Sequence, residues 1–198
     1  MMIYAMILAA GESKRMGKPK LILPFGETII LGAVINNVLS SKADKILVVL
    51  GSDAEKIRKK IENLSLEITT NPGYQKGMLS SVQWGFKNLS DNAKAALVCL
   101  GDQPGISTVV INKVIDVYKR TRKGIVIPVY KKNRGHPVLI DIKYRKDVKN
   151  LNPDIGLREL VYNHPEDTVE VKVETPSILY DIDDPDDYRK ELKNKDRI

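Results

Sequence analysis

The segment Met6–Lys20 constrains this chain more than any other, and it reads M-I-L-A-A-G-E-S-K-R-M-G-K-P-K. An apolar run leads into residues with small side chains or none, so backbone N–H groups there can approach a ligand closely. Four cations, Lys14, Arg15, Lys18 and Lys20, follow in the same loop. Backbone donors and cations together form a concavity that suits a polyphosphate.

The spacing of this loop excludes two common phosphate-binding motifs. A P-loop has four residues between its first glycine and a Gly-Lys-Ser/Thr sequence. Here five residues lie between Gly11 and Gly17, and Pro19 follows Lys18. The pattern G-x-G-x-x-G is absent because Ala9 and Ser13 stand two positions from Gly11. A surface turn with solvated cations would explain the glycines alone, but not the whole string after an N-terminal strand.

Apolar runs alternate with amphipathic stretches along the whole chain, which predicts an α/β fold. We expect a Rossmann-like, doubly wound, mostly parallel sheet with helices on both faces. The expected strands are 3–8, 45–50, 66–70, 95–100, 125–129, 138–140 and 169–173. Helices are expected from about 30 to 40, from a Ser52–Glu55 capping box to 63, after Ser80 or Ser81, after Ser107, from 154 to 162 and from Pro185 after an Asp184 N-cap.

The length and composition indicate one cytoplasmic domain. The 198 residues suit a single domain, expected at 1–192, with a polar tail at 193–198. Cys99 is the only cysteine, and no signal peptide or membrane-spanning run is seen, so we expect a cytoplasmic protein without a membrane partner.

The net charge of +7 raises the question of which anion the protein binds. Lysines and arginines are spread along the chain, and only 6% of residues are aromatic, which is unlike a nucleic-acid platform. A small polyanion is therefore the favoured ligand, and nucleic acid is the weaker alternative.

Two acidic segments are candidates for binding a metal ion. The strongest buried strand ends in Gly-Asp-Gln-Pro, which places Asp102 at the carboxyl end of a central strand, where open α/β sheets bind ligands. Asp181 and Asp183 alternate around Ile182, so their side chains share one side of an extended segment. Carboxylate oxygens suit Mg²⁺, a hard cation that also holds substrate phosphates. An ordinary turn-forming aspartate is the alternative for Asp102.

The chain resembles the MobA-like nucleotidyltransferases, whose signature reads L-A-[AG]-G-x-[SG]-x-R-M-G-x-x-K. Similar family motifs are G-D-x-P, Gly-His-Pro and D-[IV]-D-T-P-E-D, the last with Asp184 here in place of Thr. The resemblance implies the nucleotide-diphospho-sugar transferase-like fold and transfer of a nucleoside monophosphate to a phosphorylated acceptor. The Ala9-Ala10-Gly11 sequence is similar to the molybdenum cofactor cytidylyltransferase branch, since guanylyl enzymes usually have Gly at the position of Ala10.

The same resemblance implies roles for individual residues. Arg15, Lys20 and Asp102 are expected to be catalytic, and Gly135 and His136 to face the acceptor. Asp102, Asp181 and Asp183 are the expected Mg²⁺ ligands, and the sequence leaves open which of Asp181 and Asp183 contacts the metal. His136 is equally well explained as part of a turn. The expected nucleotide-binding residues are Leu8, Ala9, Ala10, Gly11, Arg15, Lys20, Asn71, Gly77, Met78, Ser80 and Asp102.

The implied reaction is Mg²⁺-dependent transfer of CMP from CTP to the phosphate of a molybdenum-molybdopterin, with release of pyrophosphate. The phosphorylated pterin and a client molybdenum hydroxylase are the implied partners. Two alternatives remain: a guanylyltransferase or sugar-phosphate nucleotidyltransferase of the same fold, and a non-catalytic carrier that hands the cofactor to a hydroxylase.

Overall fold

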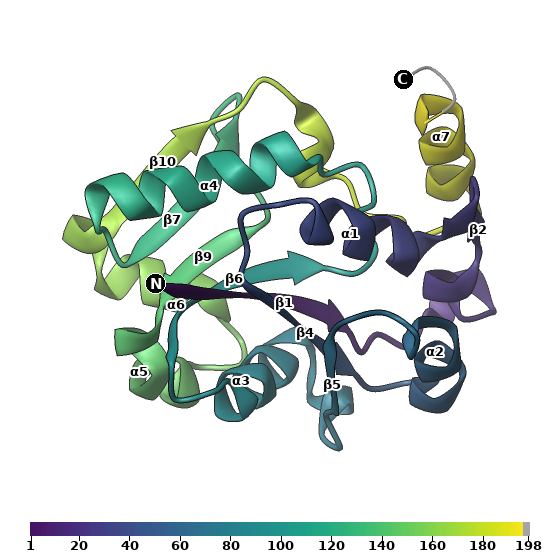
Figure 1. The fold of residues 1–198 in the computed structure, drawn as a ribbon, viewed down its shortest axis with the longest axis horizontal. Coiled ribbons are helices and arrows are strands. Elements are labelled where there is room, and N and C mark those ends of the chain that lie inside the picture. Colours follow the sequence, from purple (N-terminus) through teal and green to yellow (C-terminus); the bar gives the residue numbers. More distant parts are fainter. Residues whose placement is uncertain (196–198) are drawn as a thin grey trace.

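A computed structural model describes residues 1–195. It has an eight-stranded sheet with helices on both sides (Figure 1). The strands of this sheet are β1 (Met2–Ala9), β4 (Lys45–Leu50), β5 (Glu67–Thr70), β6 (Ala93–Leu100), β7 (Ile125–Tyr130), β8 (Asn133–Arg134), β9 (Val138–Asp141) and β10 (Thr168–Lys172). A separate small hairpin joins β2 (Pro24–Phe25) to β3 (Thr28–Ile29).

Seven α-helices are present among the described residues. They are α1 (Ile30–Leu39), α2 (Ala54–Ile61), α3 (Met78–Asn88), α4 (Thr108–Thr121), α5 (Arg145–Asn150), α6 (Leu157–Asn163) and α7 (Pro185–Lys195). None of the helices in residues 1–195 is long and apolar enough to cross a membrane.

The strand order β10-β7-β9-β6-β1-β4-β5 confirms the doubly wound prediction. Strands β5, β4, β1 and β6 are parallel neighbours, and β9 is the antiparallel member between β6 and β7. The chain moves outward from β1 to β4 and β5, then returns to the other side of β1 at β6. This reversal opens a crevice at the carboxyl ends of β1 and β6, where sheets of this kind bind ligands.

Strand β1 lies in the interior of the sheet, and both of its faces are buried. Ile3, Ala5 and Ile7 pack on one face with α1, α2 and α4, while Tyr4 and Met6 pack on the other with α3, α5 and α6. Because helices cover both faces of this strand, neither face is open to solvent, and its sequence is continuously apolar instead of alternating between apolar and polar residues. The sheet therefore holds the end of β1 rigidly at the crevice.

Several helix starts differ from prediction. The Ser52–Glu55 capping box does not form: α2 begins after Asp53, a residue with φ of +52°, and no side chain caps it. Helix α3 begins after Gly77, so Ser80 and Ser81 lie inside its first turn and neither is the cap. Residues 154–156 form a turn, and α6 begins later, at Leu157. A hydroxyl caps only when the backbone places it beside free N–H groups, and backbone geometry decided otherwise at these sites.

The C-terminal helix begins as predicted. Asp184 Oδ1 accepts hydrogen bonds from the backbone N–H groups of Asp186 and Asp187, at 2.8 and 2.9 Å. These bonds are the main reason why the pKa of Asp184 is lowered. Helix α7 continues to Lys195, so it includes part of the expected 193–198 tail; residues 196–198 lie outside the described range.

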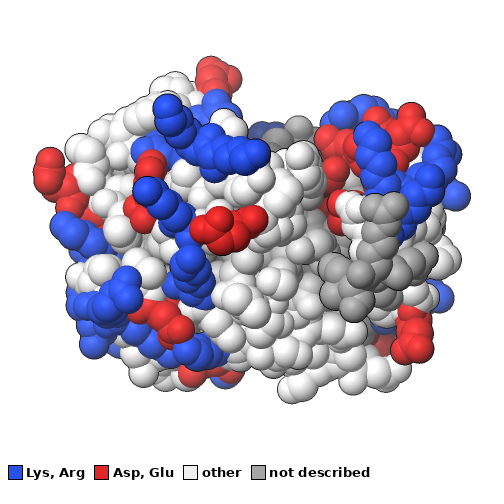
Figure 2. Space-filling model, turned by 90° about the horizontal axis from the view of Figure 1, so that it is seen from above, with Lys and Arg blue, Asp and Glu red and all other residues white. Residues whose placement is uncertain are grey.

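Charge is mixed over the face seen in Figure 2. Lysine and arginine side chains there are interspersed with aspartate and glutamate around a largely uncharged central area. The excess of cations in the composition is therefore not gathered into one continuous basic track on this face.

Candidate active site

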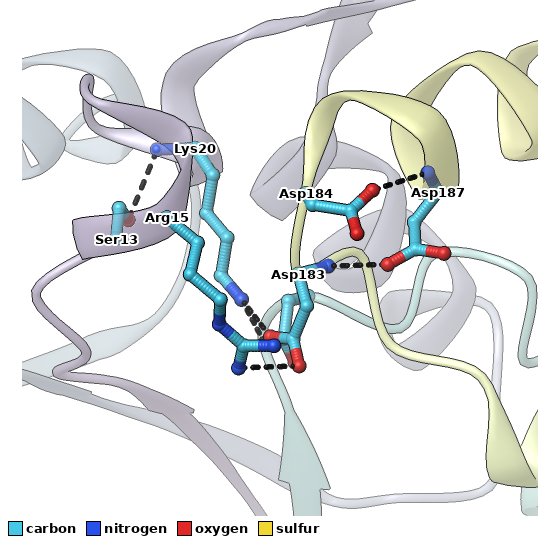
Figure 3. A network of polar contacts seen from close by, with 7 residues as sticks. Ser13, Arg15, Lys20, Asp183, Asp184 and Asp187 are labelled. Atoms are coloured by element: carbon cyan, nitrogen blue, oxygen red, sulfur yellow. Dashed lines mark hydrogen bonds and ion pairs between the residues drawn. The ribbon is translucent and has the colours of Figure 1, made fainter.

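Three segments far apart in sequence meet at the crevice between β1 and β6. The loop after β1 supplies Arg15 and Lys20, and the segment before α7 supplies Asp183 (Figure 3). The turn after β6 supplies Asp102. The last two segments are joined through their backbones, because the Ile182 N–H donates to the carbonyl of Asp102 at 3.0 Å. Ile182 is fully buried, which anchors the segment and directs its neighbours outward.

The structure brings together the carboxylates of Asp102, Asp181 and Asp183. One oxygen of each lies within 4.8 Å of the others, so the three could share a cation. Burial and the negative charges of Asp102 and Asp183 together raise the pKa of Asp181. A group of like charges at this distance is stabilised by a cation placed among them.

Lys20 already supplies one positive charge to this cluster. Its Nζ lies 2.6 Å from Asp102 Oδ2 and 3.0 Å from Asp183 Oδ1, and only 11% of its side chain is exposed. Burial alone would lower the pKa of Lys20, but the contacts with Asp102 and Asp183 outweigh burial and raise it. Lys20 is therefore a fully charged ammonium group inside the acidic cluster at neutral pH.

Arg15 contacts the same cluster from the solvent side. Its guanidinium lies 2.8 Å from Asp183 Oδ2, and 70% of its side chain is exposed. Burial raises the pKa of Asp183, but Lys20 and Arg15 outweigh it, so the pKa is lowered overall. Asp183 is thus the carboxylate that both cations hold in its ionised form.

The loop between β1 and Lys20 is held in a fixed shape that leaves its backbone open. Ser13 and Gly17 adopt left-handed conformations, and Ser13 Oγ accepts a hydrogen bond from the Lys20 N–H at 3.1 Å (Figure 3). A β-carbon added at Gly11 would meet nothing within 4 Å. The loop encloses a hollow of about 360 Å³ lined by Leu8, Ala9, Gly11, Glu12, Ser13, Lys14, Arg15, Lys20, Leu21, Asp102 and Asp183.

A second hollow of about 330 Å³ lies on the other side of Asp102. It shares Leu8, Gly11, Glu12 and Asp102 with the first, and its further lining is Ala10, Tyr74, Gln75, Gly77, Met78, Ser81, Leu100 and Asp181. Of the residues expected to bind a nucleotide, Ala10, Gly77 and Met78 line this hollow and not the first, while Leu8, Gly11 and Asp102 line both. Tyr74 and Ser81 were not among the expected residues, because nothing in a single sequence shows which face of a loop turns inward.

Asn71 and Ser80 are not brought into either hollow. Asn71 is buried; its amide donates to Ser80 Oγ and Ser81 Oγ at 3.0 and 3.1 Å, and its Oδ1 accepts from the Gly73 N–H. The single hydroxyl proton of Ser80 can be donated to the carbonyl of Gly77 or of Gly73, which lie 2.8 and 3.0 Å from Oγ. These two side chains therefore hold the loop that presents Gly77, Met78 and Ser81 to the hollow.

A third hollow, of about 390 Å³, contains the residues expected to face the acceptor. Met78 lines both the second and the third hollow, so these two hollows are neighbours. Apolar side chains from β7, β9 and α6 form much of its lining, and Arg134, His136 and Arg158 add polar groups. Neither arginine was among the expected residues, although Arg134 directly precedes Gly135 in the sequence.

Gly135 and His136 are also constrained by packing. A β-carbon at Gly135 would lie 2.2 Å from the carbonyl oxygen of Ile178, and the His136 N–H donates to that same oxygen at 3.1 Å. Burial lowers the pKa of His136 to about 4, so its imidazole is neutral at pH 7. A neutral imidazole can donate one hydrogen bond to a phosphate but adds no positive charge.

The model of the MobA-like NTP transferase domain matches residues 5–169. The chain belongs to this family. The family resemblance seen in the sequence is thereby confirmed, and the protein is a nucleotidyltransferase with the expected fold.

Two curated relatives extend the comparison. The chain is 28% identical to the molybdenum cofactor cytidylyltransferase of Escherichia coli over 193 residues, which covers 94% of this chain and 93% of the relative. It is also 28% identical over 173 residues to the nicotine blue oxidoreductase of Paenarthrobacter nicotinovorans, which covers 82% of this chain and 83% of the relative.

Among solved structures, Rv0371c of Mycobacterium tuberculosis is similar over nearly the whole length. It has 27% sequence identity and a TM-score of 0.87, and the match covers 98% of both chains. A structure of Rv0371c in complex with manganese matches with 25% identity and a TM-score of 0.82, over 98% of this chain and 99% of that one.

Proposed function

We propose that the protein transfers CMP from CTP to the phosphate of a molybdenum-molybdopterin and releases pyrophosphate, with Mg²⁺ as the cofactor. The observation that carries the proposal is the meeting of Asp102, Asp181, Asp183 and Lys20 beside two neighbouring hollows that share Asp102. One hollow is lined by cations and open backbone, which suits a triphosphate. The other leads toward a third hollow with room for an acceptor.

The donor set fits a hard divalent cation. Three carboxylates with oxygens within 4.8 Å of one another offer the ligand type that Mg²⁺ prefers, and an ammonium group already stands among them. Asp102, Asp181 and Asp183 would hold the metal. When bound, Mg²⁺ would neutralise phosphate charge and make the α-phosphorus more electrophilic.

Side chains and backbone groups of the protein bind the phosphates and stabilise the leaving group. Arg15, Lys20 and the N–H groups of the loop bind the β- and γ-phosphates and stabilise the charge that leaves with pyrophosphate. An oxygen of the acceptor phosphate forms a new bond to the α-phosphorus as the bond from that atom to the β-phosphate oxygen breaks. The acceptor phosphate is already ionised at pH 7, so positioning and charge stabilisation suffice and no general base is needed.

The proposal also specifies the base of the nucleotide and the acceptor substrate. Ala10 lines the second hollow, and the Escherichia coli relative is named for the cytidylyl reaction, which together favour CTP. The neighbouring third hollow, with Arg134, His136 and Arg158, suits a planar acceptor that carries a phosphate. A client molybdenum hydroxylase and a cytoplasmic location belong to the same proposal, the latter resting on the single cysteine and the nucleotide substrate.

The first test is thermal stabilisation by CTP, GTP, UTP and ATP, each with and without Mg²⁺. A ligand at about 100 times its dissociation constant adds roughly 2.7 kcal/mol, which is readily seen in the melting temperature. Stabilisation by CTP with Mg²⁺ that GTP does not match supports the proposal, and a preference for GTP favours a guanylyltransferase.

Pyrophosphate release is the second and deciding measurement, because one relative is named as an oxidoreductase. Release with the pterin acceptor supports the full reaction, and release only with a sugar phosphate assigns a different acceptor. If the protein binds the molybdenum cofactor but is not stabilised by any nucleotide and releases no pyrophosphate, the carrier alternative is favoured.

A further inference from the structure

The ammonium group of Lys20 stands where a metal ion would also need to be. Lys20 Nζ contacts Asp102 and Asp183, which are two of the three carboxylates that could share a divalent cation. We propose that Lys20 is a resident counter-cation of this cluster and competes with the metal for it, so that the metal binds tightly only once a nucleoside triphosphate has drawn the lysine away. This inference rests on the proposed function, because it takes the cluster to be the metal site.

The competition follows from the distances and the burial. With contacts of 2.6 and 3.0 Å and 11% exposure, the Lys20 charge is poorly screened from any cation bound by the same oxygens. Two cations on one pair of carboxylates repel each other, and each weakens the binding of the other. Arg15 cannot impose the same cost, since 70% of its side chain is exposed and it contacts Asp183 alone.

The loop allows the ammonium group to move while its backbone stays in place. The Lys20 N–H is bonded to Ser13 Oγ, and a short 3₁₀ turn over Lys20–Ile22 continues from it. The four-carbon side chain borders the hollow of about 360 Å³ that also contains Gly11 and Arg15. A triphosphate in this hollow offers the ammonium group oxygens that can replace those of Asp102 and Asp183.

The consequence is a coupling between metal and nucleotide. Binding of CTP removes the competing charge and raises the affinity for the metal, and by thermodynamic necessity the metal raises the affinity for CTP to the same degree. Lys20 therefore controls when the metal binds, in addition to its proposed role at the phosphates.

The test measures Mn²⁺ binding by electron paramagnetic resonance, with and without CTP. Three variants are compared with the unmodified chain: Lys20→Gln, which keeps a donor but loses the charge; Lys20→Arg, which keeps the charge; and Lys18→Met, which removes the charge of an exposed lysine of the same loop. Without CTP, Lys20→Gln is expected to bind Mn²⁺ about tenfold more tightly, a change of about 1.4 kcal/mol. Lys20→Arg and Lys18→Met are expected to stay within about twofold of the unmodified chain, well below that tenfold change.

The effect of CTP is the second readout. In the unmodified chain CTP is expected to tighten Mn²⁺ binding by about tenfold, within the usual range of coupling between sites, and in Lys20→Gln by much less. Equal Mn²⁺ affinity of Lys20→Gln and the unmodified chain without CTP would overturn the inference. An equal gain in Lys18→Met would also overturn it, because the effect would then come from the net charge of the loop.

An Asp102→Asn variant separates failure of this inference from failure of the proposed function. If Asp102→Asn loses Mn²⁺ binding in the presence of CTP while Lys20→Gln shows no gain, the metal site stands and only the competition is wrong. If Asp102→Asn binds Mn²⁺ as well as the unmodified chain, the cluster is not the metal site and both proposals fail.

Discussion

The Nζ of Lys20 lies 2.6 Å from Oδ2 of Asp102, although 82 positions separate these residues in the chain. The contact joins the loop after β1 to the turn after β6 across the crevice of the sheet. Asp183, a further 81 positions along the sequence from Asp102, closes the same cluster.

Replacing Asp102 by Asn is expected to lower the turnover of CTP by about a hundredfold or more, because a neutral amide is a poor ligand for a hard cation and stabilises less charge. Pyrophosphate release checks the rate, and thermal melting checks the fold. Asp116→Asn is the matched control, since Asp116 pairs with Lys42 at the surface, away from the crevice. Near-normal turnover in Asp102→Asn would remove this carboxylate from the metal site.

Replacing Arg15 by Ala is expected to weaken CTP binding by about tenfold, the loss of one charge-assisted contact to phosphate. Stability should change by less than about 1 kcal/mol, because the ion pair with Asp183 is largely exposed. Calorimetric titration of CTP gives the affinity. Unchanged CTP affinity would take Arg15 out of the triphosphate site.

Two glycines are expected to behave oppositely when changed to alanine. Gly135→Ala should cost about 2–3 kcal/mol and lower the melting temperature by about 5–10 °C, because the new β-carbon would lie 2.2 Å from the Ile178 oxygen. Gly11→Ala should leave the melting temperature nearly unchanged, since the space around it is open, but should weaken CTP binding. A stable Gly135→Ala protein would mean that this turn can shift.

Replacing Asn71 by Ala is expected to destabilise the fold by about 1–3 kcal/mol, because three hydrogen bonds of a buried amide are lost. Asn88→Ala is the control, since its amide makes one exposed bond to the Trp84 carbonyl. Denaturant unfolding compares the two. If Asn71→Ala instead keeps its stability and loses only CTP affinity, Asn71 contacts the nucleotide directly.

Stability is expected to fall as the pH drops from about 6.5 toward 4 because of His136. In that range the unfolded chain binds a proton on this imidazole, whose ordinary pKa is 6.5, while the native state, with a pKa of about 4, does not. The loss reaches up to about 3 kcal/mol and is smaller in His136→Asn. The slope of stability against pH, measured by unfolding in denaturant, checks this.

The chain has two histidines, so the His136 prediction can also be followed by nuclear magnetic resonance. His164→Asn identifies the signal of His136, which should titrate near pH 4. Titration near 6.5 would contradict the burial seen in the structure. An upward shift of this pKa on adding the phosphorylated acceptor would support a contact between His136 and the acceptor phosphate.

Much of the fold could be predicted because its signals are local. Strand β1 is read from an unbroken apolar run, and the start of α7 from Asp184 followed by Pro185, whose hydrogen bonds involve only near neighbours. The starts of α2 and α3 were predicted wrongly because they depend on contacts that are not local. Both follow residues with positive φ, Asp53 and Gly77, whose conformations depend on how the preceding loop packs.

The sequence by itself determined which groups are available: a small-residue loop with cations, a carboxylate after a central strand, and two more before the last helix. Only the tertiary structure decided that Lys20 enters the acidic cluster, that the Asn71 amide bonds to Ser80 and Ser81, and that Tyr74 and Ser81 line the second hollow. The reason is physical. Local sequence fixes backbone preference and the alternation of side chains, whereas a contact across 82 positions depends on which strands pair and on the charge and burial that result.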